Sequence, residues 1–175
     1  RKNTGDSTPA VVHTEIVPGH SIELTVAAKG GGSENKAKLA MLNPSDDLTE
    51  WVTETLPTLG AGWCPPGILG IGIGGTPEKA MLMAKESLMA PVDMAAIVER
   101  GPKTPTETLR LKIYEAVNRL GIGAQGLGGL TTVLDVQINT YATHAASLPV
   151  AMIPNCAATR HIHITLDGSG PAELP

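Results

Sequence analysis

The chain has 175 residues, a formal net charge of −4 at pH 7, two cysteines and no phenylalanine. This length allows one domain with a real core, and the acidic charge argues against nucleic acid or an anionic membrane as a partner. No apolar run reaches the roughly 18 residues of a transmembrane helix, and no signal peptide is visible. Because two cysteines in such a length do not form a disulfide framework, we expect a cytoplasmic protein.

The first elements in chain order are two expected strands, 11–17 and 21–28, joined by a Pro-Gly turn. In the second strand Ile22, Leu24 and Val26 alternate with polar residues, which predicts one buried face.

A helix follows, with Ser45 as its expected N-cap and a stop at Gly60. The apolar run 68–73 favours a buried strand, and two glycines then lead into a helix capped by Thr76 that ends near Leu88.

The second half of the chain begins with an expected loop, 100–103, and a helix, 104–120, whose first residues have the spacing of a capping box. Three more runs, 133–138, 150–153 and 162–166, are typical of strands.

This mixture of strands and helices predicts an α+β (mixed α/β) fold, a single layered domain with three main helices. We assign residues 1–167 to this domain and residues 168–175, GSGPAELP, to a linker.

Both cysteines lie in stretches rich in glycine and proline, where a turn can gather thiolates and backbone N–H groups. Cys64 stands in GWCPPGILGIGIGGT and Cys156 in THAASLPVAMIPNCAATR. Two thiolates are too few to hold an iron–sulfur cluster alone. Three interpretations are open from the residues themselves: two small buried side chains, a zinc site with His161 and His163, or part of a larger site.

Two glycine-rich segments can contact a ligand through their backbone. The run from Gly70 to Gly75 fits G-x-G-x-x-G, and Asp93 follows about 20 residues later, as in a dinucleotide site. A simpler interpretation is an N–H-rich turn beside the Cys64 loop. The segment KGGGSENK, residues 29–36, is either a flexible loop or a nest for a carboxylate.

Three polar side chains near these segments are weaker candidates. His144 lies among small residues, so it is either a core histidine or a group that hydrogen-bonds a substrate. Arg160 can pair with a carboxylate or stay solvated. Gln125, in the loop GAQGLGG, has no assigned role.

Five segments carry a resemblance to a known family: NTGDSTPA, KGGGSENK, CPPGILGIGIGGT, LGIGAQGLGG and THAASLPVAMIPNC. In this order they resemble the alpha-type region of class I fumarases, the oxygen-sensitive iron–sulfur hydro-lyases, and of the related L-tartrate dehydratases. The family also has a cysteine segment before the first motif and a beta-type region after the last, so we expect both ends here to be cut from a longer polypeptide.

The resemblance implies a [4Fe-4S] cluster held by three cysteines, of which Cys64 and Cys156 are two and the third lies upstream. It also implies that Gly32, through its main chain, and His144 bind a small dicarboxylate substrate. The proton-transferring base and several arginines are then expected on the beta-type domain, outside this chain. The implied partners are therefore these missing parts of the enzyme and a second copy in a homodimer.

The function implied is reversible hydration of an unsaturated dicarboxylate, with fumarate to L-malate as the first choice and L-tartrate or mesaconate chemistry as the alternative. Alternatives of another class are a nucleotide-binding module and a non-catalytic anion-binding domain. The isolated 175-residue chain is expected to be inactive.

Overall fold

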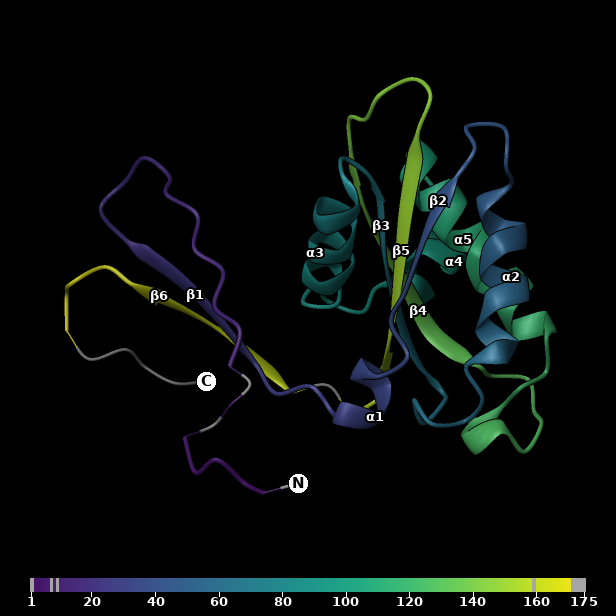
Figure 1. Cartoon of the computed structure of the whole chain (residues 1–175), viewed down its shortest axis with the longest axis horizontal. Helices are drawn as coiled ribbons and strands as arrows, with labels where there is room; N and C mark the ends of the chain where they lie inside the picture. Colours follow the sequence, from purple (N-terminus) through teal and green to yellow (C-terminus); the bar gives the residue numbers. More distant parts are fainter. Residues whose placement is uncertain (1, 7, 9, 159, 171–175) are drawn as a thin grey trace. The chain divides into compact units, whose positions relative to one another are not determined.

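The computed structural model describes residues 2–6, 8, 10–158 and 160–170, and it confirms a mixed α+β fold (Figure 1). The chain divides into a larger unit, Thr25–Ile162, and a smaller one formed by the residues before and after it. No helix in the described part of the chain is both long enough and apolar enough to cross a membrane. The expected linker 168–175 falls partly on residues 171–175, which lie outside the described residues.

The larger unit is built on a four-stranded sheet in the order β2-β5-β3-β4. β3 (Gly67–Gly74) runs parallel to β4 (Val133–Tyr141) and antiparallel to β5 (Leu148–Cys156), which in turn pairs antiparallel with the edge strand β2 (Lys38–Leu42). β3 and β5 are almost wholly buried, as expected of central strands covered on both faces. The sequence predicted β3, β4 and β5, although β4 and β5 are longer than expected, and it missed β2.

Helices cover both faces of this sheet (Figure 1). One face packs against α2 (Leu48–Thr58), α4 (Met94–Arg100) and α5 (Pro105–Arg119), and the other against α3 (Pro77–Ser87). The three main helices that the sequence predicted are α2, α3 and α5. Two short helices were missed: α4, and α1 (Gly31–Glu34) in the segment expected to be a loop.

The alternating glycines of β3 let α3 approach the sheet closely. A Cβ atom on Gly70 would lie 2.2 Å from the carbonyl oxygen of Ala84, and one on Gly72 would lie 2.0 Å from that of Ala80. The residues that alternate with these glycines, Leu69 and Ile71, point to the opposite face and join the larger core cluster. The glycine run is therefore required by packing between strand and helix.

Helix capping follows the sequence at two of three sites. The Thr76 and Thr104 hydroxyls cap α3 and α5 as predicted. The N-cap of α2 is Asp47, whose Oδ1 accepts the N–H of Thr49 at 2.7 Å, so the expectation of Ser45 was wrong. Both Ser45 and Asp47 are residues that can cap a helix, but α2 begins at Leu48, directly after Asp47.

The strand expected over residues 11–17 is absent, and those residues are exposed. β1 (Ile22–Ala27) and β6 (His161–Leu166) form a two-stranded sheet. The predicted buried face of β1 was wrong, because Ile22, Leu24 and Val26 are 62%, 41% and 51% exposed. Apolar alternation identifies a face that favours burial, but a two-stranded sheet has no second layer of its own to bury it.

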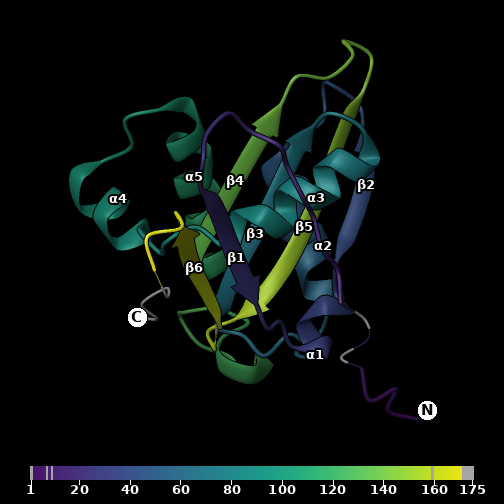
Figure 2. The ribbon, with the colours of Figure 1, turned by 90° about the vertical axis from the view of Figure 1, so that its left-hand side faces the viewer.

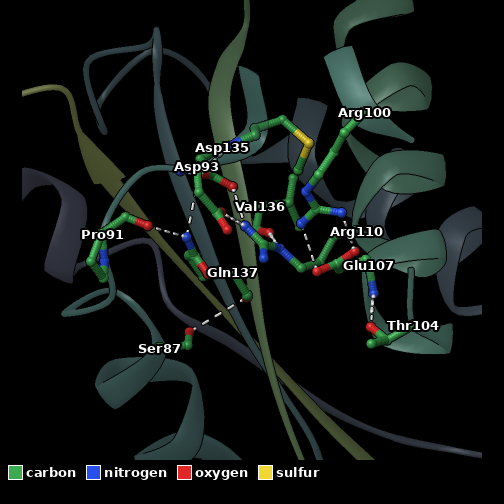
Figure 3. A network of polar contacts seen from close by, with 11 residues as sticks. Ser87, Pro91, Asp93, Arg100, Thr104, Glu107, Arg110, Asp135, Val136 and Gln137 are labelled. Atoms are coloured by element: carbon green, nitrogen blue, oxygen red, sulfur yellow. Dashed lines mark hydrogen bonds and ion pairs between the residues drawn. The ribbon is translucent and has the colours of Figure 1, made fainter. Parts of the chain in front are cut away.

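A buried polar network holds α4 and α5 against β4 (Figure 3). The guanidinium of Arg110 on α5 pairs with Asp135, fully buried on β4, at 2.9 Å, and with Asp93 before α4. Asp135 also accepts the backbone N–H groups of Asp93 and Met94. Burial acts to lower the pKa of Arg110, but the two carboxylates hold it above its ordinary value. This buried charge is therefore compensated from several directions.

Candidate functional site

The two cysteines lie at the same end of the central sheet. Cys156 is the last residue of β5, and its Cα partner on β3 is Gly67, three residues after Cys64. Cys64 is exposed and Cys156 is half-buried. Because three residues span at most about 11 Å, the register keeps both thiols in one region although they lie 92 positions apart in the chain.

Three glycine-rich loops converge at this end of the sheet, which Figure 2 shows below the strands around α1. A Cβ atom on Gly32 would lie 2.6 Å from the carbonyl oxygen of Gly62, just before Cys64. The Gln125 N–H, in the loop 121–129, donates to the carbonyl of Pro65 at 2.7 Å. The three loops are the segment around Gly32, the segment from Gly62 to Pro65, and the loop 121–129 that contains Gln125. We call these loops, together with Cys64 and Cys156, the cysteine end.

The α1 segment adds charge to the cysteine end. Lys29 Nζ donates to Ser33 Oγ at 2.8 Å and lies 3.4 Å from Glu34, which also pairs with Lys85. Burial lowers the pKa of Lys29, and the Glu34 carboxylate only partly offsets that effect. Burial acts to raise the pKa of Glu34, but its two lysine partners hold it below its ordinary value. A half-buried lysine is thus held in the α1 segment by Ser33 and Glu34.

The Gly32 segment has a regular structure, whereas the sequence was interpreted as a flexible loop or as a nest for a carboxylate. It forms a one-turn helix in which the Ser33 hydroxyl donates to the carbonyl of Gly30 at 3.0 Å. The contact with Gly62 gives a structural reason for glycine at position 32, independent of any ligand. The expected main-chain contact of Gly32 with substrate stays a prediction.

His144 lies at the other end of the sheet, in the loop between β4 and β5. Its side chain is exposed, so the interpretation as a core histidine was wrong. Nδ1 accepts the N–H of Ala146 at 3.1 Å, which leaves the proton of a neutral ring on Nε2. Nε2 is therefore a donor available to an anionic ligand.

Beside His144 is an open hollow of about 570 Å³. Its polar lining includes Lys79, whose ammonium lies 5.4 Å from the ring centroid of Tyr141, and the hydroxyl residues Thr143 and Ser147. One cation, one imidazole and several hydroxyls can together bind a carboxylate.

The full length of β5 separates His144 from Cys156. Nine extended residues, Leu148–Cys156, span about 26 Å, far more than a four-carbon dicarboxylate. Figures 1 and 2 agree, with the β4–β5 loop at the upper end of the sheet and α1 at the lower. The predicted substrate-binding residue and the predicted cluster ligands of one chain therefore do not meet in one site.

The glycine run does not form the expected turn beside Cys64. Gly74 and Gly75, which have φ of 90° and 69°, turn the chain at the far end of β3 from Cys64. Asp93, the expected ribose ligand, is paired with Arg110. Packing and ion pairing thus account for the features that suggested a dinucleotide site.

The described residues contain no group of three His, Cys, Asp or Glu side chains that could hold a metal ion. The zinc alternative with Cys156, His161 and His163 therefore gains no support. The assignment of Cys64 and Cys156 as two ligands of a cluster with a further ligand from elsewhere stays a prediction. Arg160 is exposed, and its carbonyl accepts the N–H of Ala28 at 2.8 Å.

Sequence reasoning missed the interactions between the loops of the cysteine end. Glu34 and Lys85 lie 51 positions apart, and Gln125 and Pro65 lie 60 apart, so no local pattern links them. The glycine content of the loops was the available signal, because glycine permits close backbone approach.

Known proteins are similar to nearly the whole chain. The family described as "Fumarate hydratase (Fumerase)" matches residues 1–165. A Methanocaldococcus jannaschii protein, named provisionally as an L(+)-tartrate dehydratase subunit alpha, is 42% identical over 142 residues, which cover 79% of this chain and 48% of that protein. The L(+)-tartrate dehydratase subunit alpha of Escherichia coli K12 is 33% identical over 162 residues, 91% of this chain and 52% of the relative. The chain thus spans about half the length of these relatives.

Proposed function

Because the chain belongs to the fumarate hydratase family, we propose that it is the cysteine-bearing part of an iron–sulfur hydro-lyase acting on a small dicarboxylate. The observation that carries this proposal is the pairing of Cys156 with Gly67, which puts the segments of both cysteines at one end of the sheet. The relatives named above are dehydratase subunits, which is consistent with addition or removal of water.

Cys64 and Cys156 would hold a [4Fe-4S] cluster together with a third cysteine from outside this chain. When bound, a cluster iron with an open position supplies Lewis acidity toward substrate oxygen atoms. The exposed thiol of Cys64 and the half-buried thiol of Cys156 suit a cluster at the edge of this unit, with one side open to substrate.

The loops of the cysteine end would bind the substrate carboxylates. The Gly32 backbone lies beside Gly62 and the Cys64 loop, so its main chain can approach a ligand there. Lys29 places a positive charge at the same end. This charge would favour a dianionic substrate, and the hydrogen bond from Lys29 to Ser33 would hold the loop that contacts it.

His144 would complete the substrate site of a second copy. The length of β5 prevents it from reaching the cysteine end of its own chain. In a two-fold dimer, each His144 hollow would meet the partner's cysteine end, which gives two equal sites. His144 Nε2 would then donate to a substrate carboxylate or hydroxyl.

The remaining groups would come from polypeptide outside this chain. The third cysteine is expected upstream, and the base that handles the C–H proton is expected on a beta-type domain or subunit. The names of these relatives, which call them alpha subunits, support a partner of another subunit type. We propose a cytoplasmic setting, since an oxygen-sensitive cluster requires reducing conditions.

Two substrates are supported by different observations. Fumarate, hydrated to L-malate, follows from the family, and L(+)-tartrate follows from the names of the relatives. The test is to assemble the complete protein under anaerobic conditions, with iron and sulfide, and to measure both reactions. Oxygen-sensitive turnover of either substrate is expected. Full turnover after removal of iron by a chelator would refute the proposal.

The two-copy site has its own test, in which His144→Ala and Cys64→Ser chains are co-expressed. Each homodimer should be inactive. A mixed dimer should contain one complete site, so random pairing should restore about a quarter of wild-type activity. No restoration in mixtures shown to contain mixed dimers would refute a role for His144 across the interface.

A further inference from the structure

The two non-glycine residues with positive φ in the described part of the chain are neighbours in space. They are Cys64, with φ of 59°, and Gln125, with φ of 54°. They lie 61 positions apart in the sequence, yet the Gln125 N–H donates at 2.7 Å to the carbonyl of Pro65, the residue after Cys64. Backbone of this kind is unfavourable for L residues and persists only where the surroundings enforce it.

The hydrogen bond from Gln125 satisfies a buried acceptor. Pro65 is buried, whereas Gln125 lies on the surface. A buried carbonyl without a donor is costly, so the Cys64 loop is most stable when the Gln125 N–H is in place. The side-chain amide of Gln125 lies 3.5 Å from the same oxygen and adds a weaker second donor.

The loop that presents Gln125 is closed by its own backbone hydrogen bonds. Within residues 121–129, Gly128 donates to Ile122 at 2.9 Å and Gly129 donates to Gly121 at 3.2 Å. A Cβ atom on Gly123 would lie 2.3 Å from the Gly128 backbone, so the two arms of the loop are in contact. Gln125 therefore stands on a closed turn and not on a free surface loop.

One residue, Thr132, joins this turn to the start of β3. Its hydroxyl accepts the N–H of Gly123 at 3.2 Å, and its carbonyl accepts the N–H of Gly67 at 3.3 Å. The side-chain carbonyl of Asn118, on α5, accepts the N–H of Thr132 at 2.7 Å. The segment from Cys64 to Gly67 is thus held at two points. Gln125, in the loop 121–129, binds the Pro65 carbonyl, and Thr132, which is bonded to that loop, binds the Gly67 N–H.

We propose that Gln125 is a positioning residue, which holds the Cys64 loop in its positive-φ conformation and so aims the Cys64 thiol before any cluster is bound. Its backbone conformation, which brings the N–H to the Pro65 carbonyl, carries this role. The importance of the thiol for activity rests on the proposed function, but the conformational claim does not.

The test compares two substitutions of Gln125 that have opposite preferences for positive φ. Gln125→Val disfavours positive φ, whereas Gln125→Gly adopts it freely and keeps the N–H. Hydrogen exchange of the Cys64 and Gly67 amides is measured in the complete protein, as isolated and after removal of metal. In the metal-free protein, exchange should be about five- to thirty-fold faster in Gln125→Val and near wild type in Gln125→Gly.

Leu127→Val is the matched control, because it places a β-branched residue in the same loop at an exposed position with φ of −92°. It should leave the exchange of both amides unchanged. Gln125→Ala, which has a smaller penalty at positive φ, replaces Gln125→Val if that variant does not fold. Gln125→Asn, which tolerates this region, should restore slow exchange.

Equal exchange in wild type and in the Val and Ala variants would overturn the proposal, as would equally fast exchange in Gln125→Gly. The iron content of the same samples separates this claim from the proposed function. A wild type that holds no iron would refute the iron–sulfur proposal and leave the exchange result standing. Unaltered exchange would refute the role of Gln125 and leave the iron–sulfur proposal intact.

Discussion

Gly67 on β3 and Cys156 on β5 are direct partners across the two central strands of the sheet. Gly67 also begins the strand that follows the Cys64 loop, so it links the two cysteine segments. A Cβ atom at this position would lie 2.1 Å from the carbonyl oxygen of Asn155 and 2.8 Å from Trp63 Cζ3. Because of this tight contact, a side chain at position 67 would disturb the packing of both cysteine segments.

We expect Gly67→Ala to push the start of β3 away from the end of β5 and to lower the free energy of unfolding by about 1–3 kcal/mol. In the complete protein it should also reduce iron content, because the two cysteine segments separate. Urea unfolding and iron analysis measure the two effects. Gly31→Ala, where a Cβ atom meets nothing within 4 Å, is the control. A variant as stable and as rich in iron as wild type would contradict this view of the strand pair.

The buried acid on β4 should be one of the most sensitive positions of the fold. Asp135→Ala removes one of the two carboxylates that pair with the Arg110 guanidinium and leaves the N–H groups at the start of α4 without their acceptor. Loss of one partner of a buried ion pair costs about 3–5 kcal/mol. Asp135→Asn keeps one carbonyl oxygen as an acceptor and should cost less. Urea midpoints test this order, and a loss below about 1 kcal/mol for the alanine variant would show that the network adds little to stability.

The pair between Arg100 and Glu107 should make stability depend on pH in the acid range. The Arg100 guanidinium, with two contacts of 2.9 Å, and the Lys103 N–H lower the pKa of Glu107 to about 2 from an ordinary value of 4.5. The stabilisation is therefore complete above about pH 4.5 and is lost as the pH falls toward 2.

Glu107→Gln should accordingly lower the urea midpoint at pH 7, and the difference from wild type should shrink below pH 4.5 and vanish near pH 2. Glu115→Gln is the control, since its contact with Arg119 is exposed and 3.8 Å long. If the difference in urea midpoint between Glu107→Gln and wild type stays constant from pH 7 to pH 3, the charge of Glu107 does not cause it, and the prediction is contradicted.

The sequence correctly predicted the helices and strands whose own residues carry a local signal, such as a capping residue or an apolar run. Thr76 and Thr104 start helices where capping residues precede proline, and the run of Ile68 to Ile73 forms the central strand. The start of α2 was placed too early because both Ser45 and Asp47 can cap a helix, and the tertiary fold selects between them.

The arrangement of the candidate site could be predicted only in part. Family motifs singled out Cys64, Cys156, Gly32 and His144, but not the distance between them. That distance depends on the register of β3 with β5 and on the full length of β5, which extends two residues before and three after the predicted strand. The same limit explains why Gln125 had no assigned role: its partner, Pro65, is 60 positions away.

The central claim is that Cys64 and Cys156 bind one iron–sulfur cluster, and the most direct measurement is iron and sulfide content with the visible spectrum of the complete protein. Cys64→Ser and Cys156→Ser should each abolish the brown chromophore and the oxygen-sensitive hydro-lyase activity. His144→Ala should keep the chromophore and lose about 100-fold or more in turnover, since it misplaces the substrate without removing a ligand. A full chromophore and full iron content in either serine variant would contradict the claim.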